Sequence, residues 1–157
     1  MQREHLTVTT EGLRLLIPRA KSDQQGRGAE LGLPRGRKPE TCPVRALEAW
    51  LQASSCRYGP VFRKIDRWGN LETAALHPYA LPKILARRLA LAGIKAISLE
   101  RLSPHGLRAG FITEAYKACA RDEAIMAHSR HRDIRTMRGY VRRAKLVDES
   151  PAGMVGL

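Results

Sequence analysis

The sequence predicts an α+β fold: a mostly helical body with a small N-terminal antiparallel β-sheet. β-rich runs with turn residues occupy residues 5–34, and apolar residues recur with helical spacing from residue 43 onward. The length of 157 residues suits one domain. A chain of this size buries enough surface to form a core without disulfides or a structural metal. We therefore expect one domain over residues 1–157.

Strands are predicted near the N-terminus. Two β-rich runs within residues 5–17 are separated by Thr10-Glu11-Gly12, which is typical of a hairpin. A polar, glycine-bearing stretch follows at residues 21–28, and a third apolar run covers residues 29–34. This pattern predicts a small antiparallel sheet with Lys21 at or near a turn.

Helices are predicted in the rest of the chain. Pro43 suits the first position of a helix whose apolar residues share one face, and residues 59–69 fit a short strand pair or loop. A helix over residues 81–92 would end at Gly93. The apolar face of the first helix consists of Val44, Leu47, Trp50 and Leu51.

The C-terminal third predicts three more helices. Ser103 is a candidate N-cap and Pro104 the first residue of a helix that runs to residue 120. Shorter helices are expected over residues 121–127 and 133–145, followed by a tail over residues 146–157.

The charge balance points to a polyanionic partner. The chain has 28 Lys and Arg against 15 Asp and Glu, a net charge of +13, which favours DNA or RNA, with an anionic membrane as the rival partner. No stretch is apolar enough for a membrane span, and no signal peptide opens the chain, so we expect a cytoplasmic protein with no membrane partner. Three cysteines without metal spacing predict free, mostly structural thiols.

His105 and Arg108 are candidates for phosphate binding. They lie three residues apart on the opening turn of a predicted helix, so they share a face near its positive end. Taken alone, the pair also fits a solvated or salt-bridged surface.

Tyr140 is a candidate nucleophile. It lies in residues 130–145, where seven Lys or Arg stand against one acid, Asp133. A phenol, with a reference pKa of about 10, becomes a usable nucleophile when cations stabilise the phenolate or a base takes its proton. A tyrosine in a basic helix can instead pack its ring and point its hydroxyl at water.

Lys21, His105, Arg108, His131 and Tyr140, taken in order, resemble the catalytic domain of tyrosine site-specific recombinases, the phage integrase family. The resemblance covers essentially all 157 residues. Three segments carry it: the hairpin ending in Lys21-Ser-Asp, Ser103-Pro-His-Gly-Leu-Arg-Ala-Gly110, and Ile125-Met-Ala-His-Ser-Arg-His-Arg-Asp-Ile-Arg-Thr-Met-Arg-Gly-Tyr140-Val-Arg.

The resemblance implies site-specific DNA recombination or integration through a 3′-phosphotyrosyl intermediate. By position, Tyr140 would attack the phosphate and Lys21 would protonate the leaving 5′-oxygen. Arg108 would hold the non-bridging oxygens, His105 would handle the tyrosine proton, and His131 would hydrogen-bond the phosphate.

The same resemblance implies double-stranded DNA as partner, a homotetramer of the full-length enzyme on DNA, and no cofactor or metal ion. His128 and His131 lie three apart, but two imidazoles without a third ligand make a poor zinc site. Basic residues around the nucleophile are predicted to bind DNA. They are Arg130, Arg132, Arg135, Arg138, Arg142 and Arg143.

Two features depart from the family pattern. The residue before the histidine is normally glycine, and here it is Arg130. The family's first catalytic arginine lies in an Arg-x-x-Glu-Leu type helix ahead of the hairpin, and the residues ahead of the hairpin here, Arg3 included, contain no such segment. We therefore expect an N-terminally truncated piece that also lacks the preceding DNA-clamping domain. Loss of one preorganised donor typically costs on the order of 10²–10³ in rate, so we expect cleavage by the chain alone to be impaired.

Other functions fit the same composition. A non-catalytic DNA-binding module would place helices in a groove and basic side chains on phosphates. An RNA-binding protein would share the salt-dependent affinity but would prefer structured RNA. Type IB topoisomerases use similar residues, although the spacing of His131 and Tyr140 is more similar to that of integrases.

Overall fold

The computed structural model describes residues 1–19, 28–95, 102–144 and 155, with only the backbone at residues 142–144. The chain forms two compact units, Met1–Pro78 and Tyr79–Leu157, which are described separately below. The predicted Lys21 and the predicted tail, apart from Val155, lie outside the described residues.

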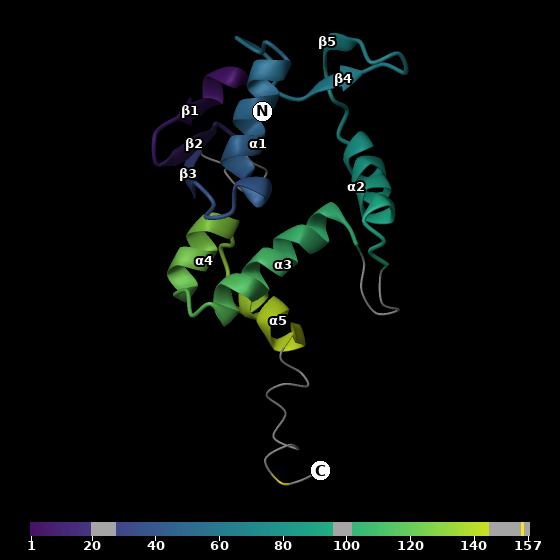
Figure 1. Cartoon of the computed structure of the whole chain (residues 1–157). Coiled ribbons are helices and arrows are strands. Elements are labelled where there is room, and N and C mark those ends of the chain that lie inside the picture. The colour runs from purple at the N-terminus through teal and green to yellow at the C-terminus, as the bar shows by residue number, and fades with distance from the viewer. Residues whose placement is uncertain (20–27, 96–101, 145–154, 156–157) are drawn as a thin grey trace. The chain divides into compact units, whose positions relative to one another are not determined.

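The first unit is built on a three-stranded antiparallel sheet. Its strands β1 (Leu6–Val8), β2 (Gly12–Ile17) and β3 (Ala29–Pro34) lie in the order β1-β2-β3, with β2 in the centre (Figure 1). The three predicted runs are therefore strands. In the register, Leu13 lies opposite Leu33 and Leu15 opposite Leu31, so apolar side chains pair across the sheet.

Helix α1 (Pro43–Ala53) supplies the other half of this core. Val44 is fully buried, and the rest of its predicted apolar face is partly buried against the same cluster. The indole Nε1 of Trp50 donates to the carbonyl of Val61 at 2.7 Å, which satisfies its polar atom inside the packing. The buried cluster consists of Leu6, Leu13, Cys42, Val44 and Val61.

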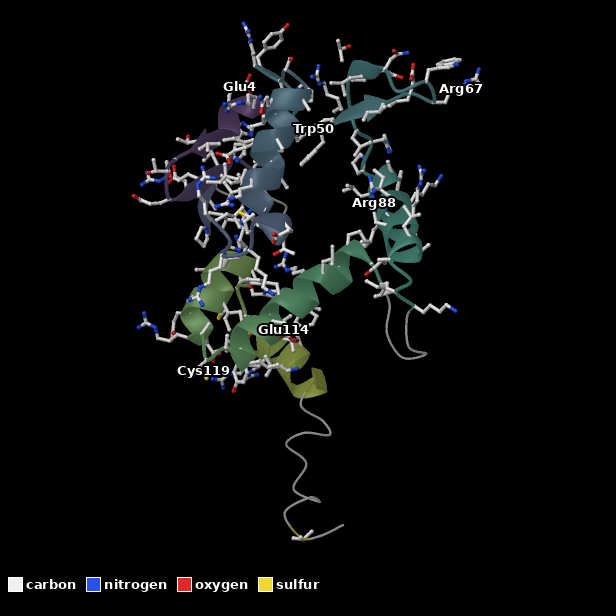
Figure 2. All side chains as sticks on the ribbon, in the orientation of Figure 1. Glu4, Trp50, Arg67, Arg88, Glu114 and Cys119 are labelled. Carbon is white, nitrogen blue, oxygen red and sulfur yellow. The ribbon has the colours of Figure 1, made fainter. Side chains whose placement is uncertain are left out.

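A second hairpin joins β4 (Arg63–Ile65) and β5 (Leu71–Ala75) in the same unit. Of the short strand pair or loop predicted over residues 59–69, the structure shows one strand and the turn, and the second strand begins at Leu71. The carboxylate of Asp66 closes the turn by accepting from the backbone N–H groups of Trp68 and Asn70, both at 2.8 Å. Arg67 lies in this turn (Figure 2), its guanidinium carbon 4.1 Å from the ring centroid of Trp68.

The second unit is helical. It contains α2 (Ala80–Leu91), α3 (Pro104–Lys117), α4 (Asp122–Ser129) and α5 (Ile134–Ala144), of which the last three lie together (Figure 1). One buried cluster joins these three helices, which fixes α5 against α3 and α4. Its members are Ile112, Ile125, Met137 and Val141.

Local signals explain where these helices begin and end. The hydroxyl of Ser103 accepts from the backbone N–H of Gly106 at 3.0 Å, so Ser103 is the N-cap that the sequence predicts. Gly93 follows α2 with φ of 67°, as expected for a helix-ending glycine. Cys119 adopts φ of 59°, which ends α3 before the predicted residue 120.

Asp133 caps α5 rather than beginning it. Its carboxylate accepts from the backbone N–H groups of Arg135 at 3.0 Å and Thr136 at 3.1 Å, so the helix starts at Ile134. The Thr136 hydroxyl also donates to it, and these hydrogen bonds hold the pKa of Asp133 below its usual value. Within the described ranges, none of the helices has the length and apolarity needed to cross a bilayer.

Candidate active site

Four of the five predicted catalytic residues lie in the helical unit, where they come from two helices and the segment after a third. His105 and Arg108 belong to α3, His131 follows α4, and Tyr140 belongs to α5. The fifth, Lys21, lies outside the described residues.

The opening turn of α3 presents His105 and Arg108 at the surface. Both side chains are exposed, as their spacing on one face predicts. The Ser103 cap and Pro104 define where the helix starts, so its unpaired N–H groups and partial positive charge lie at this turn. An anionic phosphate is favoured at such a position.

Tyr140 lies beside His105. The ring of Tyr140 is partly buried against the core of the unit, and its hydroxyl lies 2.9 Å from His105 Nε2. The two ring centroids are 5.9 Å apart with an interplanar angle of 56°. Residues 35 positions apart in the chain therefore make a direct hydrogen bond between a phenol and an imidazole.

His131 is presented by a left-handed residue at the end of α4. Arg130 has φ of 58° and ψ of 40°, and its backbone N–H bonds to the carbonyl of Met126. The backbone N–H of His131 reaches the same carbonyl at 3.1 Å. Glycine adopts this left-handed conformation easily. Arg130 therefore has the backbone geometry that suits the glycine normally found at this position in the family.

The His131 ring connects Arg108 with Tyr140. Its centroid lies 5.8 Å from that of Tyr140 in an edge arrangement of 66°. Nη2 of Arg108 lies 3.3 Å from His131 Nδ1, and the hydroxyl of Ser129 lies 2.8 Å from the same nitrogen. A phenol, two imidazoles and a guanidinium thus form one cluster.

The surroundings of His131 favour the neutral form of its ring. Desolvation by burial lowers the pKa of His131 below its usual value, and electrostatic interactions with Arg108 and, to a smaller extent, His105 act in the same direction. A bound phosphate would act in the opposite direction, because its negative charge favours imidazolium.

The basic residues predicted to bind DNA fall into different environments. Arg132, Arg135 and Arg138 are all exposed, but Arg138 is paired within the protein, with Nε 2.9 Å and Nη2 2.5 Å from Oδ2 of Asp122. The hydrogen bonds and ion pair with Asp122 raise the pKa of Arg138 above its ordinary value. Of Arg142 and Arg143 only the backbone, within α5, is described.

Two residues of this region were missed by sequence reasoning. Asp122 pairs with Arg138 across 16 positions, and no local pattern indicates that pairing. Ser129 contacts His131 from two positions away, and a hydroxyl two residues before the histidine is a signal that could have been noticed.

The two neighbouring histidines have separate surroundings. The ring of His128 lies 4.7 Å from that of Phe111, centroid to centroid, while His131 contacts Ser129 and Arg108. Among the residues described, no group of three or more His, Cys, Asp or Glu side chains has the arrangement to hold a metal ion.

The chain is similar to integrases and site-specific recombinases, in agreement with the resemblance that the motifs predict. The chain is 29% identical over 150 residues to an integrase/recombinase XerD homologue of Selenomonas ruminantium. That match covers 96% of this chain and 43% of the relative, so the chain spans less than half of its length.

Solved structures agree on the fold. The XerH site-specific recombinase bound to its difH substrate, in a pre-cleavage complex, matches with a TM-score of 0.61 at 20% identity, over 94% of this chain and 38% of XerH. The post-cleavage complex of XerH with palindromic difH matches with a TM-score of 0.60 at 20% identity, over 94% of this chain and 40% of that one. No family model matches the chain.

Proposed function

We propose that this chain carries the strand-cleaving residues of a site-specific DNA recombinase or integrase that acts on double-stranded DNA. The observation that carries the proposal is the 2.9 Å contact between the Tyr140 hydroxyl and His105 Nε2, with Arg108 and His131 alongside. A nucleophile, a proton acceptor and donors for an anion within one cluster are the parts that phosphoryl transfer requires.

In the proposed reaction, Tyr140 Oη attacks a backbone phosphorus and its proton passes to His105 Nε2. The P–O5′ bond breaks as the P–Oη bond forms, and the 5′-oxygen leaves with a proton from Lys21. Arg108 and His131 bind the non-bridging oxygens, where charge accumulates. The reverse steps, with a different 5′-hydroxyl, rejoin the strand.

No energy input is needed for this exchange, because the phosphotyrosyl bond conserves the phosphodiester linkage. We accordingly propose no cofactor or metal. The side chains of Arg130, Arg132 and Arg135 would contribute phosphate contacts that weaken with salt. The relative is an integrase/recombinase and the XerH structures hold a difH substrate, which supports action on DNA. A cytoplasmic location and a homotetramer of the full-length enzyme on DNA belong to the proposal and rest on the family resemblance.

A covalent trapping experiment tests the proposal. The chain is incubated with a pool of nicked suicide duplexes whose central sequence is randomised, then denatured, and any protein–DNA adduct is mapped by mass spectrometry. A parallel reaction contains free guanidinium ion, which can supply a second guanidinium group to the phosphate.

We expect a DNA adduct on Tyr140, slow for the chain alone, and none with Tyr140→Phe, whose DNA binding should persist. If the chain binds DNA but forms no adduct, with or without guanidinium ion, the catalytic proposal is wrong and the non-catalytic DNA-binding module is the remaining interpretation. Tighter binding to structured RNA than to duplex DNA would instead favour the RNA-binding alternative.

A further inference from the structure

Ser129 is a buried hydroxyl beside a residue of the proposed reaction. It is the last residue of α4, and its side chain has a relative exposure of 8%. Its Oγ has two close neighbours, the carbonyl of Ile125 at 2.6 Å and His131 Nδ1 at 2.8 Å. Both distances are those of good hydrogen bonds.

The hydrogen count decides the direction of these bonds. A serine hydroxyl carries one hydrogen, and a carbonyl oxygen can only accept, so the Ser129 hydrogen is committed to Ile125. Oγ therefore presents a lone pair to Nδ1 of His131. A hydrogen bond between them requires the ring to carry its hydrogen on Nδ1.

Arg108 would favour the other tautomer, because a guanidinium donates only and would need a lone pair on Nδ1. That contact is longer, at 3.3 Å, and Arg108 is exposed, whereas Ser129 is buried and only 2.8 Å away. An unmet polar contact costs more in the buried position. We therefore expect His131 Nδ1 to bond to Ser129 and not to Arg108. The N–H groups of Arg108 then remain available to a phosphate.

We propose that Ser129 is a positioning residue that fixes His131 in the Nδ1–H tautomer and leaves Nε2 as the nitrogen that serves the reaction. This inference rests on the proposed function for its catalytic meaning. Ser129 accepts from Nδ1–H in both the neutral ring and the imidazolium. Nε2 can therefore gain a proton and donate to a phosphate oxygen while the bond to Ser129 stays in place.

The chain contains a matched control for this hydroxyl. Ser54 directly follows α1 in the other unit and is also 8% exposed. Its hydroxyl donates to the carbonyl four residues back, that of Trp50, at 2.6 Å. The acceptor of the Ser54 hydroxyl is a carbonyl oxygen and not a histidine nitrogen. Ser54→Ala therefore reproduces the loss of a buried, back-bonded hydroxyl without touching His131.

Nitrogen NMR of the imidazole rings tests the tautomer directly, in the full chain and without DNA. At about pH 8, above the ordinary histidine pKa of about 6.5, the ring is neutral and the protonated nitrogen can be identified. We expect hydrogen on Nδ1 of His131 in the unmodified protein and in Ser129→Thr, which retains a hydroxyl. Ser129→Ala should shift the population toward Nε2–H, and Ser54→Ala should leave it unchanged.

The activity readout is the rate of adduct formation with the suicide duplex pool. We expect Ser129→Ala to lower it about tenfold to a hundredfold, the range found when a metal-binding histidine loses the partner that orients it. Ser129→Thr should restore most of the rate, and Ser54→Ala should not change it.

Hydrogen on Nε2 of His131 in the unmodified protein would overturn the inference, and this measurement needs no variant to fold. An unchanged tautomer in folded Ser129→Ala would overturn it as well. If the tautomer behaves as expected but no adduct forms with any protein, the proposed function fails while the role of Ser129 toward His131 stands.

Discussion

Nε2 of His105 lies 2.9 Å from the hydroxyl of Tyr140, which joins the first turn of α3 to the middle of α5. The distance is short enough for direct proton transfer with no intervening water. The helix positions that create it are held by packing among α3, α4 and α5.

Removal of this proton acceptor should slow strand cleavage. We expect His105→Gln to lower the rate of adduct formation by about 10²–10⁴, the range for general acid–base groups, because an amide does not take a proton. The rate is measured in single-turnover reactions on the suicide duplex. His128→Gln is the control, since the His128 ring contacts Phe111, and it should leave the rate nearly unchanged. Equal rates for His105→Gln and the unmodified chain would contradict the assignment.

The pKa of His131 should be found below the ordinary value of about 6.5, and Arg108→Ala should raise it. Burial is the main cause, so removal of the Arg108 charge should restore only part of the difference. Proton NMR titration of the histidine rings measures both values. A His131 pKa above the ordinary value would contradict this prediction.

A lowered histidine pKa also has a consequence for stability. The unfolded state then binds more protons than the folded state, so this group weakens the fold as pH falls from the unfolded pKa toward the folded one. Denaturant unfolding at pH values from 8 to 5 should show a smaller loss of stability for His131→Gln than for the unmodified chain.

Substitution of Arg130 by glycine should stabilise the helical unit. A non-glycine residue in the left-handed region costs about 1–2 kcal/mol, and the greater freedom of glycine in the unfolded chain offsets part of that gain. We expect the free energy of unfolding to rise by up to about 1 kcal/mol. Arg132→Gly removes the same charge two residues later, where no positive φ is found, and should give no such gain.

The ion pair of Arg138 with Asp122 should contribute little to stability but should limit the role of Arg138 in DNA binding. The Arg138 side chain is 54% exposed and that of Asp122 is 14% exposed, so we expect a coupling free energy of about 0.5–1 kcal/mol in a double-mutant cycle. Because Arg138 is engaged by Asp122, Arg138→Ala should weaken DNA affinity less than Arg135→Ala. An equal or larger loss for Arg138→Ala would show that the pair opens on DNA.

Met137 should be the most sensitive position of α5. It is fully buried among Ile112, Ile125 and Val141, so Met137→Ala should cost about 2–5 kcal/mol of unfolding free energy. Ile134 begins the same helix and is 40% exposed, and Ile134→Ala should cost clearly less. Denaturant unfolding of both variants measures the difference.

Much of the fold and part of the site could be predicted from the sequence. The strands near the N-terminus, the apolar face of α1, the Ser103 cap and the helix ended by Gly93 follow from local spacing and turn chemistry, because each depends on neighbours within a few residues. The second strand of the β4–β5 hairpin was missed, since Leu71–Ala75 has few apolar residues in alternation.

The sequence by itself determined which chemical groups are present: a phenol, two imidazoles and a guanidinium in the order typical of tyrosine recombinases. Only the tertiary structure decided which atoms meet, namely Tyr140 with His105 and Ser129 with His131. The reason is physical. A hydrogen bond forms or is lost with differences in distance of a few tenths of an ångström. Here the distances are set by the packing of three helices around one buried cluster, which brings together residues far apart in the chain.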